Sequence, residues 1–407
     1  MDKPAKTYYR RLLGVLFLRS STNLIFWMTA FLSLLGQGIS EVSTVQGFFL
    51  LPLITLLADL PAGAYADRMS CRAAMRISVT LDLAAFSFLG LAAFHPAFPF
   101  LGFGLKALAN AFESGASSQL LFATAERLFG TSQGSKRSSI HVEITSRLAS
   151  VTAGTGAAFL VGRYPLAPMM LAVALSACAL LLLLLHLPEQ EVQDRFEIIA
   201  QAAHELKRGL RTLVLPVFLP ITLWVLADGW RSGTEGVTFF PYLKSLLATP
   251  EILGILPLIA TGIRLPIAMM ALYGKVPVPE APGSASIFLF LGIALNVLLM
   301  TVFPRAEIAI LLASINFGLY ALRDIYQRHW LNQVVSKAQC GPVVLRSALS
   351  TANVSAQLLG TALLAWPWIS SQRALLGMVL GGGGALVLLG WAVMGRKRAR
   401  ELGNLDF

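Results

Sequence analysis

Apolar residues occur along this chain in long continuous runs that are separated by short polar breaks. Runs such as Leu180–Leu185 show no alternation of polar and apolar positions, so they do not resemble strands of a membrane barrel. Each run holds roughly 20 residues, enough for an α-helix to cross the hydrocarbon core of a bilayer. The pattern predicts twelve membrane-spanning helices, at residues 12–36, 44–63, 75–95, 98–126, 138–161, 166–187, 214–240, 252–274, 285–303, 307–333, 343–366 and 374–395.

Composition supports an all-α integral membrane protein. Hydrophobic residues make up 56% of the chain and charged residues 13%, with a mean hydropathy of +0.69. Soluble domains average about 45–50% apolar and about 25% charged residues. The first run follows several basic residues but has no convincing small-residue cleavage site after it, so we expect a retained helix rather than a signal peptide.

The net charge of +11 could suggest a nucleic-acid partner, but the distribution of the basic residues argues against one. They gather in the N-terminal tail, in every second connection and in the C-terminal tail, which is the positive-inside pattern. We therefore expect both termini in the cytoplasm, contacts with membrane lipids and no nucleic acid. The longest polar connection divides the chain into an N-terminal bundle at 1–187, a cytoplasmic loop at 188–213 and a C-terminal bundle with a basic tail at 214–407.

The turn after the second run is a candidate conformational element. It combines Gly63, Asp67, Arg68 and Arg72 where one helix leaves the lipid and the next re-enters it. Asp67 could accept hydrogen bonds from the N-terminus of a neighbouring helix, or pair with one of the arginines, and so hold two parts of the protein together. The alternative is that these residues only set topology and bind anionic headgroups.

The pattern Gly63-x-x-x-Asp67-Arg68-x-x-x-Arg72 resembles the loop 2–3 signature of the major facilitator superfamily. Asp59-Leu-Pro-Ala-Gly63, Ser114-Gly115-Ala116 and Arg346-Ser-Ala-Leu-Ser350 are similar to segments of its bacterial exporter-like branches. The resemblance covers essentially the whole chain. Two departures are Ser70-Cys71, in place of the usual Gly, and a fifth run without the Gly-Pro pair of antiporters.

The resemblance implies two pseudo-symmetric six-helix bundles that form a monomer in the bacterial inner (plasma) membrane. It also implies that the turn acts as a latch that holds the outward-facing state and breaks when the protein opens inward, with its partner near the start of the eleventh run. The expected latch residues are Asp59, Gly63, Asp67, Arg68, Arg72 and Arg346.

Ionisable residues inside the runs mark further candidate sites, because an Asp, Lys or Arg at the centre of a membrane helix costs about 2.5–3.5 kcal/mol on insertion scales. Most of them fall in runs 1, 4, 7 and 10, which the resemblance implies line the central cavity. They are Arg19, Asp82, Lys106, Glu113, Asp228, Arg231, Glu235, Arg264, Arg323 and Asp324.

Glu113 and Asp228 are the predicted carriers of a coupling proton, because burial disfavours an ionised carboxylate. The alternative is permanent ion pairs, such as Asp228 with Arg231, or Arg323 with Asp324 and another helix. The arginines of the first and eighth runs could bind an anionic group of a substrate or merely neutralise these carboxylates. The predicted proton- and substrate-coupling residues are Glu113, Asp228, Arg19, Arg264, Arg323 and Asp324.

Uncharged polar and aromatic side chains could complete an amphipathic cavity wall for an organic solute. Each of them could equally serve helix packing. The predicted lining residues are Asn23, Asn110, Trp224, Asn316 and Tyr320.

The sequence predicts a secondary active transporter that exports a small amphipathic molecule, such as a drug or a siderophore, in exchange for protons. Uptake of a metabolite and lipid flipping are alternatives, and a membrane-bound enzyme or a non-transporting sensor would be a different class. An enzyme would need a nucleophile and base together and a sensor would need a soluble domain; the sequence indicates neither. The cysteines and histidines show no metal spacing, and no phosphate-binding glycine loop is apparent, so no catalytic residue, cofactor or metal is expected.

Overall fold

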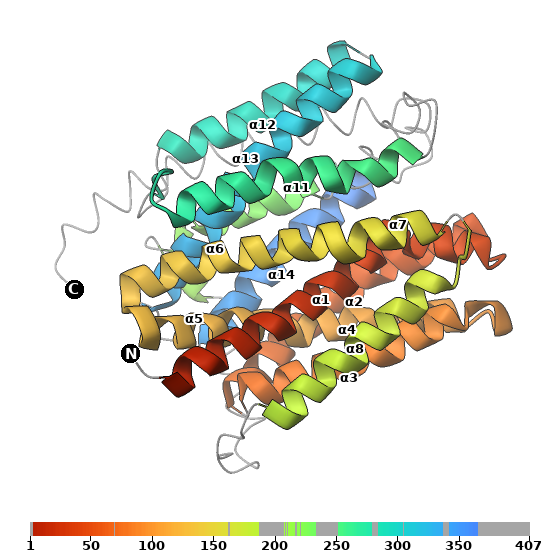
Figure 1. Ribbon diagram of the computed structural model, residues 1–407, viewed down its shortest axis with the longest axis horizontal. Helices are drawn as coiled ribbons and strands as arrows, with labels where there is room; N and C mark the ends of the chain where they lie inside the picture. The colour runs from red at the N-terminus through yellow and green to blue at the C-terminus, as the bar shows by residue number, and fades with distance from the viewer. Residues whose placement is uncertain are drawn as a thin grey trace.

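The computed structural model describes residues 3–68, 70–161, 163–186, 207, 209, 211–215, 218–219, 221–232, 251–278, 284–303, 305–336 and 342–364. These residues form helices and short connections, with no strand among them. Figure 1 shows most of the helices lying lengthwise along the long axis of the molecule. The last predicted run, 374–395, and most of the predicted central loop lie outside the described residues.

The first part of the chain forms a group of helices around α1 and α2. In chain order they are α1 (Lys3–Gly36), α2 (Glu41–Arg68), α3 (Cys71–Gly90), the short η1 (Ala92–Phe94), α4 (Phe98–Glu113), α5 (Ala116–Phe129), α6 (Thr131–Ala149), the π-helical turn η2 (Ser150–Gly154), α7 (Thr155–Val161) and α8 (Ala167–His186). The second part consists of helical residues 221–232, α11 (Glu251–Leu272), α12 (Ser284–Val302), α13 (Ala306–Ser336) and α14 (Pro342–Leu364).

Four helical segments of the described chain are long and apolar enough to cross a membrane: Gln46–Asp67, Cys71–Gly90, Ala167–Leu185 and Ala306–Asn332. The two parts of α1, Ala5–Trp27 and Thr29–Gly36, bend by 53° and make a fifth if they count as one span. These helices identify a multi-pass membrane protein. The count of twelve spans stays a prediction.

The fourth predicted run, 98–126, is broken where a continuous helix was expected. Helix α4 ends at Glu113 and α5 begins at Ala116. Gly115 between them has φ of +80°, a conformation that favours glycine. A Cβ on Gly115 would lie 2.9 Å from the Cβ of Arg346, so the break also lets α14 approach closely. The close approach of α14 and the positive φ of Gly115 together account for the break between α4 and α5.

Helices α2 and α6 make most of the described contacts at the junction between the two parts of the chain. Helix α2 packs against α4 on one side and α14 on the other, and α6 contacts both α11 and α13. The apolar cores follow this division: Phe26, Phe86 and Phe103 pack together in the first part, and Trp224 packs against Trp330 in the second. Several of the polar groups described below lie along this junction.

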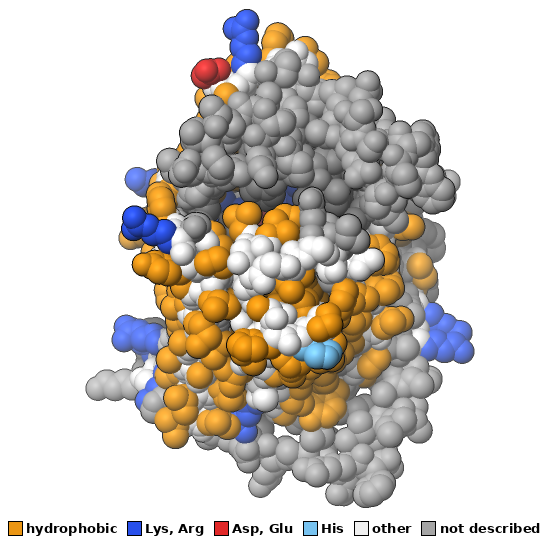
Figure 2. Space-filling view, turned by 90° about the vertical axis from the view of Figure 1, so that its right-hand side faces the viewer, with side chains coloured by type: hydrophobic (Ala, Val, Ile, Leu, Met, Phe, Trp, Pro, Cys, Tyr) orange, Lys and Arg blue, Asp and Glu red, His pale blue; other side chains and the backbone are white. Residues whose placement is uncertain are grey.

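Figure 2 shows the face at the right-hand end of Figure 1. Hydrophobic side chains occupy much of the described part of its centre, with white polar or backbone atoms and one His among them, and most of the visible Lys and Arg side chains lie toward its margin. The described part of the centre of this face is therefore largely apolar.

Candidate functional site

A buried ion-pair network joins α1, α3 and α4. Arg19 Nη1 lies 2.8 Å from Asp82 Oδ2, and Lys106 Nζ lies 2.8 Å from Asp82 Oδ1. Arg19 also bonds Glu113, and Lys106 donates to the amide oxygen of Asn23. Two positive and two negative groups compensate one another, which is the condition under which charges remain buried.

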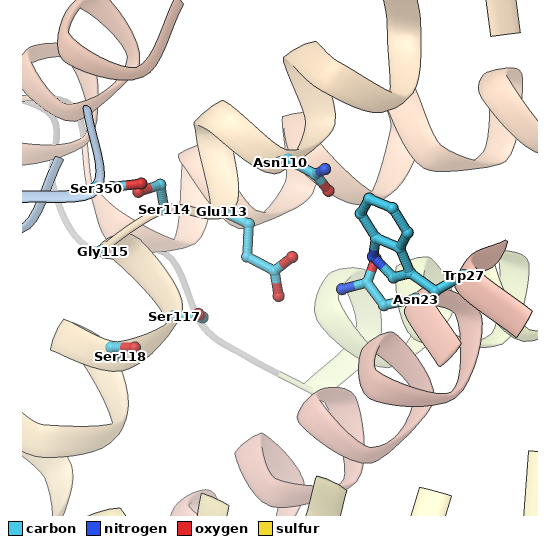
Figure 3. Close-up of a pocket in the computed structure, with 9 residues that line it drawn as sticks. All are labelled: Asn23, Trp27, Asn110, Glu113, Ser114, Gly115, Ser117, Ser118 and Ser350. Atoms are coloured by element: carbon cyan, nitrogen blue, oxygen red, sulfur yellow. The ribbon is translucent and has the colours of Figure 1, made fainter. Parts of the chain in front are cut away.

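Glu113 is the accessible end of this network. Its side chain is 20% exposed, whereas those of Asp82 and Lys106 are 0% exposed. In Figure 3 its carboxylate points into open space between Asn23 and Trp27 on one side and a group of serines on the other. A solute or a proton that enters this space can reach Glu113 without displacing the rest of the network.

That space is a pocket of about 370 Å³ at the meeting point of α1, the α4–α5 break and α14. Its volume is within the range of small-molecule sites. The lining is almost entirely polar, with one indole ring. The residues are Asn23, Trp27, Asn110, Glu113, Ser114, Gly115, Ser117, Ser118 and Ser350.

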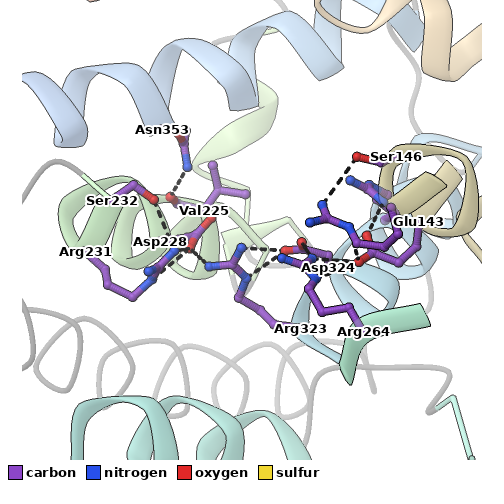
Figure 4. A network of polar contacts seen from close by, with 12 residues as sticks. Glu143, Ser146, Val225, Asp228, Arg231, Ser232, Arg264, Arg323, Asp324 and Asn353 are labelled. Atoms are coloured by element: carbon purple, nitrogen blue, oxygen red, sulfur yellow. Dashed lines mark hydrogen bonds and ion pairs between the residues drawn. The ribbon is translucent and has the colours of Figure 1, made fainter. Parts of the chain in front are cut away.

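A second polar network, shown in Figure 4, connects helical residues 221–232 to α13 and α11. Arg323 Nη1 lies 2.6 Å from Asp228 Oδ1, and Arg231 Nη2 lies 2.9 Å from the same oxygen. Arg323 also pairs with Asp324, and Asp324 with Arg264. Asp228 and Asp324 thus each bridge two arginines, so the pairs that the sequence suggested as structural are present.

Glu143 on α6 extends this network across the junction, and the sequence analysis missed it. Its side chain is 0% exposed. Arg264 Nη2 lies 2.7 Å from Oε1, Arg147 Nε lies 3.2 Å from the same oxygen and Arg328 Nη1 lies 3.2 Å from Oε2. One carboxylate from the first part of the chain therefore holds arginines of α11 and α13 from the second.

Asp67 joins α2 to the N-terminus of α14. Its Oδ1 accepts a hydrogen bond from the backbone N–H of Val343 at 3.0 Å, and its Oδ2 accepts one from Val344 at 2.7 Å. The first N–H groups of a helix have no partner within that helix, and the helix dipole favours an anion there. The carboxylate of Asp67 therefore gives two of these N–H groups an acceptor and places a negative charge at the positive end of the helix dipole.

Gly63 lies one turn before Asp67 on α2, at a close contact with α14. A Cβ at this position would lie 2.3 Å from Ser347 Oγ and 2.7 Å from Ser347 Cβ. No side chain larger than hydrogen fits without movement. The glycine of the loop signature is therefore needed for this helix contact and not only for the turn.

Arg346 on α14 contacts residues of both parts of the chain. Its Nη2 donates to Asn332 Oδ1 at 2.7 Å, and its Nε donates to Gln119 Oε1 of α5 at 3.3 Å. Nearby, the hydroxyl of Ser135 on α6 meets Nδ1 of His329 on α13 at 3.0 Å. Gln119, Ser135 and His329 were not among the predicted residues, because a polar residue near a helix end has no distinctive sequence signal.

The remaining predicted latch residues have other surroundings. Arg72 Nε donates to the hydroxyl of Tyr8 on α1 at 2.8 Å. The backbone of Arg68 ends α2, and its side chain lies outside the described part of the structure. Asp59 is buried on α2, where the hydroxyls of Ser114 and Ser350 face it.

The structure brings only some of the predicted cavity residues to the pocket. Asn23 and Asn110 line it. Trp224 is buried against Trp330, with ring centroids 5.0 Å apart, and Asn316 accepts a hydrogen bond from Asn296 of α12 at 3.0 Å. The ring of Tyr320 contacts two guanidinium groups of the second network, those of Arg231 and Arg323.

A polar pocket where two parts of a helical membrane protein meet is typical of solute transporters. Comparison with solved structures identifies the fold more closely. The structure is similar to that of the E. coli fucose:proton symporter FucP, with a TM-score of 0.67 and 12% identity over 97% of this chain and 99% of that chain. The human organic anion transporter MFSD10 matches 96% of this chain and 99% of its own, with a TM-score of 0.67 and 13% identity.

A POT family transporter in complex with a thioalcohol-conjugated peptide also matches, with a TM-score of 0.67 and 15% identity over 95% of this chain and 96% of that chain. No protein-family model and no curated protein matches the sequence itself. The chain therefore has the fold of major facilitator superfamily transporters, as its loop signature predicted.

Proposed function

We propose that this protein is a secondary active transporter that moves a small organic solute by alternating access and couples that movement to protons. The observation that carries the proposal is the position of Glu113, at the edge of the pocket and at the end of a buried ion-pair network. Arg19 can exchange Glu113 for an anionic group of a solute, or release it when the carboxylate takes up a proton. Either event changes the charge balance between α1 and α4.

The second ion-pair network is proposed to take part in proton coupling as well. Asp228 holds Arg231 and Arg323, and Glu143 holds Arg264 across the junction. Protonation of Asp228 would free two guanidinium groups to seek new partners. We therefore propose Glu113 and Asp228 as coupling carboxylates, with Arg19, Arg264, Arg323 and Asp324 as the groups that respond to them.

The contact of Asp67 with α14 is proposed to be the latch between residues 1–187 and 214–407, with Asp59, Gly63, Arg68, Arg72 and Arg346 around it. Helix–dipole and hydrogen-bond contacts of this kind are individually weak, so they can form and break in each cycle. The basic residues near this end support a cytoplasmic location for it and for both termini, in a monomer of the bacterial inner membrane.

The pocket favours a solute with several hydrogen-bonding groups. Its lining offers amide, hydroxyl and carboxylate groups and a single aromatic face, which suits an oxygen-rich molecule such as a siderophore or a polar drug better than a lipid chain. The Asp59-Leu-Pro-Ala-Gly63 segment supports export as the direction, with uptake of a metabolite as the alternative.

The proposal is tested with purified protein in liposomes that contain a trapped pH-sensitive dye. A panel of polar solutes is added, and solute-dependent proton movement is recorded with and without an imposed pH gradient. We expect at least one solute to move protons with the wild type, and the signal to fall more than tenfold in a Glu113→Gln, Asp228→Asn variant.

The matched control is Glu307→Gln, because Glu307 lies exposed in the first turn of α13. It should transport as the wild type does. Solute movement in the double variant that still responds to the pH gradient would remove these two carboxylates from the mechanism.

A further inference from the structure

Asp59 is a buried carboxyl group that the ion-pair networks do not use. Its side chain is 0% exposed in the middle of α2. Among the described residues, no hydrogen bond of good geometry reaches either carboxylate oxygen, although the hydroxyls of Ser114 and Ser350 lie near them, and no Lys, Arg or His pairs with the group. Every other buried carboxylate discussed above has a guanidinium, ammonium or backbone N–H partner.

The charged groups of the helices around Asp59 are engaged elsewhere. Arg19 and Lys106 bind Asp82, and Arg19 binds Glu113. Arg346 of α14 donates to Gln119 and Asn332. In the other part of the chain, the arginines of the second network hold Asp228, Asp324 and Glu143.

Within the part of the chain that the structure describes, the groups that face Asp59 are uncharged, namely the hydroxyls of Ser114 and Ser350. An ionised carboxylate in such a place has lost its water without gaining a cation, which is strongly unfavourable. A protonated carboxyl group is neutral, and its O–H can donate a hydrogen bond to a serine oxygen. The site therefore suits the protonated form.

The position of Asp59 on α2 connects it to the proposed latch. Asp59, Gly63 and Asp67 are each four residues apart, so they share one face of the helix. On α14 the corresponding residues are Ser350, Ser347 and Val343, which meet them in that order. Separation of α2 from α14 would break the contacts of Asp67 and at the same time expose Asp59 to water.

Asp59 is also next to the pocket. Ser114 and Ser350, which face its carboxyl group, both line the pocket that holds Glu113. In Figure 3 these two serines lie beside each other at the edge of that space. Their hydroxyls can pass a proton between pocket water and Asp59.

We infer that Asp59 is a proton-binding site that holds a proton while α2 and α14 are packed and releases it to water when they separate. The O–H bond of the carboxyl group breaks, its electron pair stays on the carboxylate, and the proton goes to water in the opened gap. The return of α14 onto α2 then requires a new proton, taken up through Ser114 or Ser350. The role of Asp59 in a transport cycle rests on the proposed function, but the two tests of its protonation do not require transport.

The first test is infrared spectroscopy of the purified protein at pH 7. The wild type should show the carbonyl band of a protonated carboxyl group, Asp59→Asn should lose it, and Asp59→Glu and the exposed control Glu307→Gln should keep it. An unchanged band in Asp59→Asn, or no such band in the wild type, overturns the inference.

The second test measures helix separation without a solute. Cys71, Cys178 and Cys340 are replaced by Ser, and Val344→Cys places a thiol at a fully buried position beside Asp67. Maleimide labelling is followed from pH 6 to pH 9 and divided by the rate at an exposed control, Tyr164→Cys, to remove the ionisation of the thiol itself.

We expect the corrected labelling rate to rise at least threefold with pH when Asp59 is present, and to stay flat in Asp59→Asn. An equal pH response in both proteins contradicts the inference. Because neither test needs transport, a failure to find a transported solute would count against the proposed function and leave the result for Asp59 to stand alone.

Discussion

Glu143 and Arg264 form an ion pair between α6 and α11, with Arg264 Nη2 2.7 Å from Glu143 Oε1. The two residues are 121 positions apart and belong to different parts of the chain. Arg147 and Arg328 bind the same carboxylate. A single buried anion thus holds three arginines, two of which belong to the other part of the chain.

Glu143→Gln should destabilise the protein, because three arginines would lose their shared anion. Loss of one partner of a buried ion pair typically costs about 3–5 kcal/mol. We expect a clear decrease in the apparent melting temperature in detergent, measured by size-exclusion chromatography after heating. Glu307→Gln is the control and should melt as the wild type does. A melting temperature of Glu143→Gln equal to that of the wild type would show that the arginines find other partners.

Asp67→Asn should weaken the contact of α2 with α14. The amide keeps one acceptor oxygen but loses the negative charge that the helix dipole favours, an effect of about 0.3–1 kcal/mol for an exposed site and up to about 2 kcal/mol when partly buried. Labelling of Val344→Cys should become faster by roughly the corresponding 2- to 30-fold. An unchanged rate, together with unchanged transport, would exclude Asp67 as a latch.

Gly63→Ala should hold α2 and α14 apart, because the new methyl carbon would be 2.3 Å from Ser347 Oγ. Overpacking of this kind typically costs about 1–3 kcal/mol. The matched test is the double variant Gly63→Ala, Ser347→Gly, which moves the glycine to the opposite helix. Labelling of Val344→Cys should be faster in Gly63→Ala and slow again in the double variant. If labelling stays fast in the double variant, Gly63→Ala acts on the turn and not on the helix contact.

Arg19→Lys should impair both stability and transport although the charge is kept. Arg19 bonds Asp82 with one terminal nitrogen and Glu113 with the other, and a single ammonium group cannot reproduce that planar fork. Thermal stability and solute-dependent proton movement are the measurements. Arg10→Lys, at an exposed position of α1, is the control, and equal loss in both variants would point to a general effect of lysine.

Trp27→Ala should raise the KM for transport with little effect on stability. The indole is 53% exposed at the pocket, so its removal leaves no closed cavity. A stacking contact with a bound solute is typically worth about 0.5–1.5 kcal/mol, which corresponds to a roughly 2- to 12-fold change. Trp27→Phe should recover most of the affinity, and an unchanged KM in Trp27→Ala would place the solute elsewhere.

The fold was largely predictable, because runs of about 20 apolar residues have few alternatives in a membrane. The partner of Asp67 was also predictable in kind, because an anion at a helix end attracts the N-terminus of another helix. The break at Gly115 was not. It depends on the approach of α14, more than 200 residues later in the chain, and a single glycine in an apolar run carries no such information.

Glu143 shows why part of the site was missed. Its spacing of four residues to Arg147 is typical of a simple pair on the surface of a helix. Only the packing of α6 against α11 and α13 makes it a buried centre for three arginines. Similarly, the sequence places Asp59 near the turn but does not show that its carboxyl group lacks a cation, since that depends on where each neighbouring arginine points.

The regular spacing of Asp59, Gly63 and Asp67 has a consequence for the kinetics of the protein. Their three partners on α14 lie on one stiff helix, so a partial separation that breaks one contact misaligns the other two. The junction is then expected to open in an all-or-none step, with few half-open molecules. Single-molecule recordings across it should show two dwell states with abrupt transitions rather than a continuous drift.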